Sequence, residues 1–327
     1  MDTQVNVIIL NWNGKRLLPE CLIGLRQQVY RSFYITLVDN GSSDGSVDFV
    51  AQNYPEVRII ALPENLGFSA ASNAALEISR TKYVALLNND AVSHPMWLNK
   101  MVEALENFPG AGFAASKMLS YYNPKIIDRA GDAYTRAGTG LLRGHARPAD
   151  SYNSIEWIFG ACAGASLYRT EMLDDAGIFD KDFFLIYEDV DLSFRAQLKG
   201  YKCLYVPEAI VYHRGSSTIV YDSPTSVYYG HRNLEWVYIK NMPAGLVLRT
   251  IFPHIIYNIA AFLFFITRGR GRDFLRAKRD AIKGFKRTLQ KRRRIQADKK
   301  VDDKYIWTML EKETIFHRLT RRIVISQ

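Results

Sequence analysis

The first 110 residues alternate short apolar runs with longer stretches in which apolar and polar positions mix. The apolar runs are rich in valine and isoleucine and have the length of strands: residues 5–10, 34–39, 57–62 and 83–87. Between them lie three stretches with helix-like patterns, at residues 15–28, 44–54 and 69–79. Strands that alternate with helices at this spacing indicate βαβ units and a mostly parallel sheet, hence an α/β fold.

Small polar segments follow each of the four predicted strands. They are "NWNG" (11–14), "DNGSSD" (39–44), "PENLGFS" (63–69) and "NND" (88–90). Ligands bind outside the carboxyl ends of the strands in such sheets, so these segments predict a shared polar pocket. The sequence has no GxGxxG motif after the first strand and no GxxxxGK[ST] motif, which argues against the common dinucleotide and P-loop sites.

The "NND" segment has two interpretations. Asn and Asp commonly form a turn before a helix, because their side chains bond to the nearby backbone. In an extended segment, however, Asn88 and Asp90 share one face. One carboxylate and one amide oxygen suit Mg²⁺ or Mn²⁺ better than zinc.

Two further groups in the second half of the chain carry candidate chemistry. Glu188 and Asp189 begin a predicted helix that runs to Lys199, where the helix dipole favours acids in the first turn. They could also supply a general base, whose pKa neighbouring aromatic side chains would raise. A predicted strand ends at His213, which by itself is more often a loop histidine than a metal ligand.

The order of the motifs resembles that of the inverting family 2 glycosyltransferases, which bind nucleotide sugars on a GT-A fold. The resemblance covers roughly residues 4–240 and is closest to bacterial rhamnosyltransferases of polysaccharide assembly. It implies a GT-A domain with a mostly parallel central sheet flanked by helices. The motifs are "VIILNWNG", "LVDNGSSDGS", "ENLGFSAASNAAL", "YVALLNNDA", "IIDRAGD", "FGACAGASLYRTEML", "FFLIYEDVDLSFRAQLKGY" and "YHRGSST".

The resemblance implies a role for each matching position. Asp189, with Glu188 beside it, would be the general base that deprotonates the acceptor. A divalent ion, Mg²⁺ or Mn²⁺, would bind Asp90 and His213; Asn88 stands where the family often has an acid, so its ligation does not follow. The remaining implied sites are Asn11, Asn13, Asp39, Asn40, Asn65, Gly67, Asn73 and Asn89 for the nucleotide, Arg214 for the diphosphate, and Gly160, Ala161 and Asp132 for the acceptor.

The implied reaction is transfer of a sugar with inversion, L-rhamnose from dTDP-rhamnose, to a glycan on a lipid-linked polyprenyl diphosphate carrier. A UDP-hexose or UDP-N-acetylhexosamine donor on the same fold is the alternative within the class. A non-catalytic, membrane-bound subunit that binds sugar nucleotides would predict loss of Asp90, Asp189 or His213, and all three are present. A nucleotidyltransferase would predict a Gly-rich, Lys-containing loop after the first strand, which "NWNGKRLLP" does not supply.

The net positive charge of the chain comes from its C-terminal third. Residues 244–267 form an apolar stretch of about the length of a membrane span, but Arg249, His254 and Asn258 interrupt it and Pro253 would kink it. Residues 268–300 then hold 15 Lys and Arg against three Asp, in a chain of net charge +10.

This pattern predicts an interfacial or re-entrant helix pair at the cytoplasmic face of a bacterial membrane, because basic residues beside an apolar segment are attracted to anionic lipid. A buried helix followed by a solvated basic helix is the alternative. The apolar segment could also serve a homodimer. Nothing else in the chain resembles a nucleic-acid-binding module, so no nucleic-acid partner is expected.

We expect a catalytic domain at residues 1–217, with a nucleotide-sugar half (about 1–110) and an acceptor half (about 111–217). A connecting helix (218–243), the membrane-associating helices (244–300) and a tail (301–327) would follow. The three cysteines are far apart and fit neither a disulfide framework nor a zinc site, which favours a reducing compartment. The first ten residues lack the pattern of a secretory signal.

Overall fold

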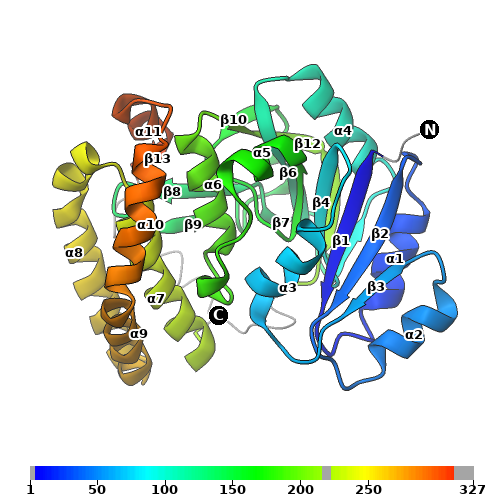
Figure 1. The fold of residues 1–327 in the computed structure, drawn as a ribbon, viewed down its shortest axis with the longest axis horizontal. Coiled ribbons are helices and arrows are strands. Elements are labelled where there is room, and N and C mark those ends of the chain that lie inside the picture. Colours follow the sequence, from blue (N-terminus) through cyan, green and yellow to red (C-terminus); the bar gives the residue numbers. More distant parts are fainter. Residues whose placement is uncertain (1–3, 216–221, 313–327) are drawn as a thin grey trace. The chain divides into compact units, whose positions relative to one another are not determined.

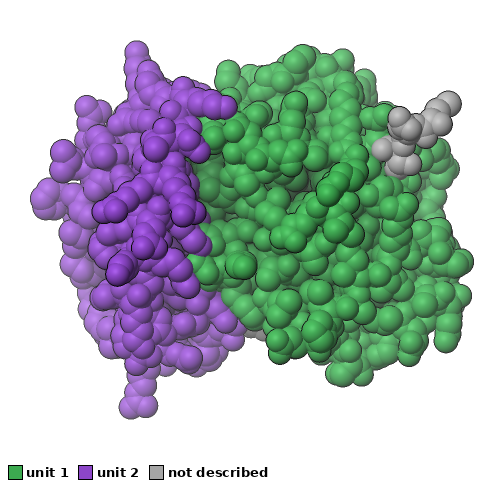
Figure 2. All heavy atoms as spheres, viewed as in Figure 1, with its two compact units in different colours: residues 1–132, 142–218 green, residues 133–141, 219–327 purple. Residues whose placement is uncertain are grey.

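A computed structural model describes residues 4–215 and 222–312 of the chain. The chain divides into two compact units (Figure 2): unit 1 holds residues 1–132 and 142–218, and unit 2 holds residues 133–141 and 219–327. The expected domain boundary at 217 and residues 313–327 of the expected tail lie outside the described residues.

A ten-stranded sheet forms the centre of unit 1 (Figure 1). The strand order is β10-β12-β6-β11-β4-β1-β2-β3, with β5 beside β12 and β7 beside β6. The strands are β1 (Val5–Asn11), β2 (Phe33–Asp39), β3 (Arg58–Ala61), β4 (Tyr83–Asn88), β5 (Ala91–Ser93), β6 (Ala111–Ser120), β7 (Ile127–Arg129), β10 (Glu156–Ile158), β11 (Ala165–Arg169) and β12 (Lys202–His213).

The four strands predicted in the first 110 residues are confirmed and run parallel. Strand β1 lies between β2 and β4, with Asn11 opposite Asp39 and Leu10 opposite Asn88. The polar residues that follow these strands therefore reach the same edge of the sheet. Strand β11 is antiparallel to both of its neighbours, β4 and β6, and β12 is again parallel to β6, so the sheet is mostly but not wholly parallel.

Helices cover both faces of the sheet because successive strand residues point to opposite sides. Val7 and Ile9 join one apolar core with the first group of helices, whereas Ile8 joins the other core. The first group is α1 (Leu18–Arg26), α2 (Ser46–Asn53) and α4 (Trp97–Asn107). The second group is α3 (Gly67–Leu76), α5 (Thr170–Ala176) and α6 (Glu188–Leu198).

Helix α6 carries the predicted catalytic acids at its first two positions, and a buried arginine fixes the helix. Arg195 donates from Nε to Asp191 Oδ2 at 2.9 Å, one turn earlier. Its guanidinium also donates to the carbonyls of Ala176, the last residue of α5, and of Gly177 and Ile178, which follow it. One side chain therefore connects α6 to the preceding loop and satisfies three backbone acceptors.

Unit 2 is mainly helical. Its helices are α7 (Pro224–Asn241), α8 (Ala244–Thr267), α9 (Gly271–Lys283), α10 (Phe285–Ala297) and α11 (Asp303–Met309). Strands β8 (Asp132–Thr135), β9 (Gly140–Leu142) and β13 (Leu310–Glu311) form a separate three-stranded sheet.

The apolar stretch at 244–267 forms the single helix α8 with Pro253 inside it, so the expectation of a helix pair is wrong. A proline removes one backbone hydrogen bond, which did not end the helix here. Within the described residues, α8 is long and apolar enough to cross a membrane. Length and composition alone do not separate such a span from a helix that packs on the protein.

We predict that Arg195→Lys lowers the free energy of unfolding by about 2–4 kcal/mol, because a lysine ammonium cannot reproduce the fork of hydrogen bonds to Asp191 and the three carbonyls. The measurement is urea unfolding of the full chain. Arg279→Lys is the matched control, since that side chain is 63% exposed and pairs only at the surface. Equal unfolding midpoints for both variants would contradict the anchoring role of Arg195.

Candidate active site

A hydrogen-bonded set of side chains occupies the carboxyl edge of β1, β2 and β4. Asn11 donates from Nδ2 to Asp39 Oδ1 at 2.9 Å and accepts from Asn89 Nδ2 at 2.8 Å. The second Asp39 oxygen accepts from the backbone N–H of Ser42 at 2.9 Å. Asn13 has a positive φ of 49° and accepts from the N–H of Ser43 at 2.8 Å. The structure thus brings four of the predicted nucleotide-site residues into one network.

A second set links the loop after β2 to the start of α3. Asn40 donates from Nδ2 to Asn65 Oδ1 at 2.9 Å, and the same Asn65 oxygen accepts from the N–H of Gly67. Asn73 lies further along α3, where its amide bonds to both the N–H and the carbonyl of Phe179. The Asn73 amide thus anchors the segment before α6.

A partly buried histidine stands between two carboxylates where β4 and β12 end. His213 Nε2 lies 3.2 Å from Asp90 Oδ1, and Nδ1 lies 3.0 Å from Asp128 Oδ2. The amide nitrogen of Asn88 is 3.4 Å from the same Nε2. Burial by itself favours the neutral ring, but the bonds to Asp128 and Asp90 outweigh it and raise the pKa of His213 to about 9.

The small-residue turn at 160–164 lies between this histidine group and the acids of α6. The N–H of Asn88 donates to the carbonyl of Gly164 at 2.9 Å. One residue earlier, the N–H of Ala163 donates to Asp189 Oδ2 at 3.3 Å. A Cβ on Gly160 would lie 2.6 Å from Ser193 Oγ, so glycine allows the turn to approach α6.

Asp132 faces Asp189 across this turn. Oxygens of both carboxylates and Sγ of Cys162 lie within 4.8 Å of one another. The Arg129 guanidinium is 3.2 Å from Asp132 Oδ1. Burial and the negative charge of Asp189, opposed by Arg129, raise the pKa of Asp132 to about 7. The pair therefore readily holds one proton near neutral pH.

The loop that enters α6 has an unusual backbone. Phe184, Ile186 and Tyr187 all have positive φ, between 65° and 76°, although none is glycine. Such conformations cost free energy and occur where surrounding contacts enforce them, commonly at functional sites. Gly67 makes room for this loop, because a Cβ there would lie 2.5 Å from the Phe184 ring.

Glu188 is buried directly after this loop. Burial, reinforced by the neighbouring Asp189, raises the pKa of Glu188 well above its usual value. Its Oε2 has no hydrogen-bond partner among the described residues. The expected desolvation of an acid at the start of α6 therefore applies to Glu188.

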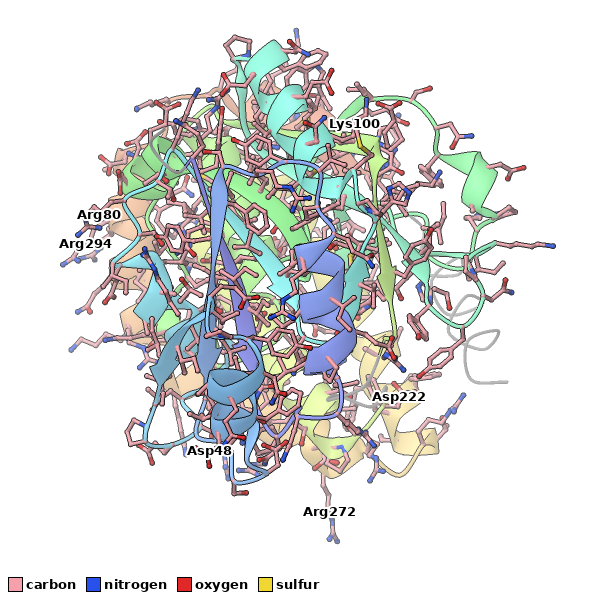
Figure 3. All side chains as sticks on the ribbon, turned by 90° about the vertical axis from the view of Figure 1, so that its right-hand side faces the viewer. Asp48, Arg80, Lys100, Asp222, Arg272 and Arg294 are labelled. Atoms are coloured by element: carbon pink, nitrogen blue, oxygen red, sulfur yellow. The ribbon has the colours of Figure 1, made fainter. Side chains whose placement is uncertain are left out.

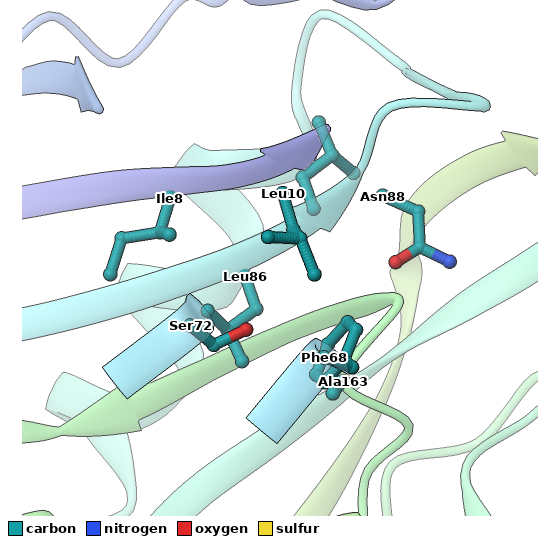
Figure 4. A pocket seen from close by; sticks show the side chains of 8 residues that line it. Ile8, Leu10, Phe68, Ser72, Leu86, Asn88 and Ala163 are labelled. Carbon is teal, nitrogen blue, oxygen red and sulfur yellow. The ribbon is translucent and has the colours of Figure 1, made fainter. Parts of the chain in front are cut away.

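A small recess opens beside Asn88 (Figure 4). Its walls are mainly apolar and come from β1, α3, β4 and the 160–164 turn, including Leu10, Phe68 and Ala163. Asn88 presents its amide at one end of this recess (Figure 4).

The donor sets differ in how well they suit a divalent metal. Asp90 and His213 offer an oxygen and an imidazole nitrogen on the same side, and the Asp128 carboxylate bonds to the other ring nitrogen, as a carboxylate often does behind a metal-bound histidine. A metal there would take the place of the proton that Asp90 stabilises on Nε2. The group of Asp132, Cys162 and Asp189 fits poorly, because Arg129 already places a cation on Asp132 and burial raises the pKa of the Cys162 thiol.

Arg214 follows His213 in the sequence. Its backbone N–H donates to the carbonyl of Asp90 at 3.1 Å, which places Arg214 beside the Asp90–His213 pair. Its guanidinium pairs with Glu20 at 2.7 Å and lies over the Tyr121 ring. Asp128, Arg129 and Cys162 were not among the predicted site residues. The first two stand in the quoted "IIDRAGD" segment, where an acid and a base next to a predicted acceptor residue were the available signal.

Comparison with known proteins agrees with this geometry. The family model "Glycosyl transferase family 2" matches residues 6–177. An N-acetylglucosaminyl-diphospho-decaprenol L-rhamnosyltransferase of Mycobacterium tuberculosis is 26% identical over 278 residues, covering 75% of this chain and 87% of that protein.

Solved structures show the same fold. The mannosyltransferase PcManGT from Pyrobaculum calidifontis, in complex with GDP-Man and Mn²⁺, aligns with a TM-score of 0.57 at 16% identity, covering 91% of this chain and 86% of that one. Residues 1–349 of S. aureus TarS, in complex with UDP-GlcNAc, align with a TM-score of 0.58 at 16% identity, covering 95% and 93%. The chain therefore belongs to glycosyl transferase family 2 and has the GT-A fold.

Proposed function

We propose that this protein transfers L-rhamnose from dTDP-L-rhamnose, with inversion, to a sugar on a polyprenyl diphosphate carrier in cell-surface polysaccharide synthesis. The M. tuberculosis relative, by its name, acts on N-acetylglucosaminyl-diphospho-decaprenol, which supports an acceptor of this class. The observation that carries the proposal is the 160–164 turn, which bonds through Ala163 to Asp189 and through Gly164 to Asn88. It keeps the base beside the residues that would face the donor diphosphate.

Asp189 would act as the general base. Ala163 holds one of its oxygens, and the carboxylate would take the proton of the acceptor hydroxyl as that oxygen attacks the anomeric carbon. Attack on the face opposite the departing nucleoside diphosphate inverts the configuration in one displacement. Glu188, buried and with a raised pKa, would remain protonated and so would not compete for the proton.

Asp90 and His213 would hold a divalent metal, which as a Lewis acid supplies positive charge to the leaving diphosphate. Asp128 would fix the His213 ring so that Nε2 faces the metal side. Arg214 would add a second positive charge near the diphosphate. The Asn11–Asp39–Asn89 network and the Asn40–Asn65 pair would bind the base and ribose of the nucleotide.

Asp132 would keep Asp189 in the active form. Two carboxyl groups this close share a proton, and the raised pKa of Asp132 assigns it to Asp132 near neutral pH. A neutral Asp132 would spare the Asp189 side chain the repulsion of a second negative charge. Gly160 and Ala161 would let the acceptor approach this pair, since their backbone is adjacent to Asp132.

A lipid-linked acceptor requires work at a membrane, and we place the enzyme at the cytoplasmic face of the bacterial cell membrane. The exposed apolar residues of α8 and the basic residues that follow it support this location.

The first prediction concerns Asp189. Asp189→Asn should lower the transfer rate by about 10²–10⁴-fold, because an amide cannot accept the proton, while the thermal shift caused by donor binding persists. The assay follows sugar transfer to an N-acetylglucosaminyl-diphospho-lipid. Asp175→Asn is the control, an acid that pairs with Lys199 away from the turn. Retained activity in Asp189→Asn would overturn the base assignment.

The second prediction concerns the donor and the metal. Unfolding midpoints measured with a panel of nucleotide sugars should rise most with dTDP-rhamnose, and only with Mg²⁺ or Mn²⁺ present. Asp90→Ala should abolish the metal dependence, and Asp128→Asn should weaken direct Mn²⁺ binding, followed by electron paramagnetic resonance, by about 10–100-fold. A shift confined to UDP-sugars would replace the rhamnose donor with a UDP-hexose or UDP-N-acetylhexosamine. No shift with any donor would favour the non-catalytic subunit.

The third prediction concerns pH. The folded protein raises the pKa of Asp132 from 3.8 to about 7, so this group stabilises the fold below pH 3.8, and that contribution is lost as the pH rises through 7. Asp132→Asn cannot lose a proton. Its unfolding midpoint, relative to the wild type, should therefore rise between pH 5 and pH 8. A difference that stays constant over this range would contradict the shared proton.

A further inference from the structure

Helix α8 carries a long exposed apolar face. We define the α8 face as Leu248, Phe252, Ile255, Ile256, Ile259, Leu263 and Ile266, whose exposed fractions range from 46% to 80%. Their spacing of three and four residues places them on one side of the helix. With about 1.5 Å of rise per residue, the face extends for about 27 Å. A contiguous exposed apolar surface of this size marks an interaction site.

The opposite side of α8 is fixed to its own unit by polar contacts. His254 lies with Nε2 3.0 Å from Glu235 Oε2 on α7 and Nδ1 2.8 Å from the carbonyl of Ala137. Lys278 on α9 pairs with the other oxygen of Glu235. Thr250 is hydrogen-bonded to the hydroxyl of Tyr238, whose ring stacks on His254.

These contacts decide between a spanning and an in-plane helix. A spanning α8 would either break them, leaving His254 in hydrocarbon, or carry the charged Glu235 and Lys278 into the membrane with it. Although burial opposes ionisation, His254 and Lys278 lower the pKa of Glu235 to about 2, so its charge persists at neutral pH. Ionised groups inside a bilayer are costly. An in-plane helix keeps the polar contacts and buries only the α8 face.

The charge beside the α8 face indicates which surface it meets. The chain continues from α8 into exposed basic side chains on and before α9, which are Arg268, Arg272, Arg276, Arg279 and Lys283. Arg272 and, on α10, Arg294 extend away from the ribbon (Figure 3). Basic residues near a membrane are attracted to anionic headgroups, and an apolar helix face with basic neighbours is typical of interfacial helices.

We infer that the α8 face lies flat in the headgroup region of an anionic membrane and docks unit 2 there without crossing the bilayer. The choice of lipid as the occupant rests on the proposed function, since a lipid-linked acceptor brings the enzyme to a membrane. The contacts of α8 that exclude a span do not depend on the donor site.

The test measures binding of the full chain to vesicles of phosphatidylcholine with 30% phosphatidylglycerol, a composition of about one anionic lipid in three. Leu248→Gln/Phe252→Gln/Ile259→Gln should lower vesicle partitioning by more than about tenfold, because three buried apolar side chains are lost. Ile78→Gln is the control. Ile78 is an apolar residue that follows α3 and is 62% exposed. The donor-induced thermal shift should be the same in all three proteins, which separates failure of docking from failure of the proposed function.

A second variant tests how much the basic side chains contribute to vesicle binding. Arg272→Gln/Arg279→Gln should weaken partitioning about fivefold for each arginine on the anionic vesicles and leave binding to pure phosphatidylcholine unchanged. Unchanged partitioning of the α8 face variant on anionic vesicles would overturn the inference. The inference would also be overturned if the wild-type protein did not bind vesicles but formed a dimer, and if light scattering showed the α8 face variant to be a monomer. The occupant of the α8 face would then be a second copy of the chain.

Depth along the helix distinguishes the in-plane from the spanning arrangement. A fluorescent label is attached to Leu248→Cys, Ile256→Cys or Ile266→Cys, each in a Cys162→Ala background. Lipids that carry a quencher at known depths then report the depth of each label in the membrane. The in-plane helix predicts one depth for all three labels, because they share a face. A label at position 256 that lies deeper than those at both ends would show a span and overturn the inference.

Discussion

The arrangement of the site depends on how two partly buried basic side chains are placed among the acids around them. His213 stands between Asp90 and Asp128, and Arg129 pairs with Asp132. Without these cations, carboxylates so close together and so far from water would repel one another and take up protons. The bond to His213 lowers the pKa of Asp128 although burial opposes this, whereas burial raises the pKa of Asp132 in spite of Arg129. Two acids on either side of Arg129 in the sequence therefore have pKa values shifted in opposite directions.

The strands and helices of the first 110 residues could be predicted because successive residues of each strand face opposite apolar cores. Val7 and Ile9 face one core and Ile8 the other, so a fully buried parallel strand appears as a continuous apolar run. The same reasoning did not predict that β11 inserts antiparallel between β4 and β6, since periodicity contains no information about strand direction. It also did not predict that α8 continues through Pro253 as a single helix, because the effect of one lost hydrogen bond depends on the packing around the helix.

The site was only partly predictable, for a related reason. Asn11, Asp39 and Asn88 follow strands, and the parallel register alone brings them together. Asp128 and Arg129 lie on a short strand, β7, whose pairing with β6 cannot be inferred from its three residues. Their roles arise from long-range contacts with His213 and Asp132. An acid and a base beside Asp132 are a local signal, but they do not reveal which distant residues these side chains contact.

The left-handed residues before α6 have a consequence for engineering. Phe184, Ile186 and Tyr187 hold conformations that glycine or asparagine would adopt at lower cost. Replacing one of them with such a residue would relieve strain in the folded chain, yet it would also free the segment that aims Glu188 and Asp189. A substitution at one of these positions would therefore exchange activity for thermal stability. A search for more stable variants should leave these three residues unchanged.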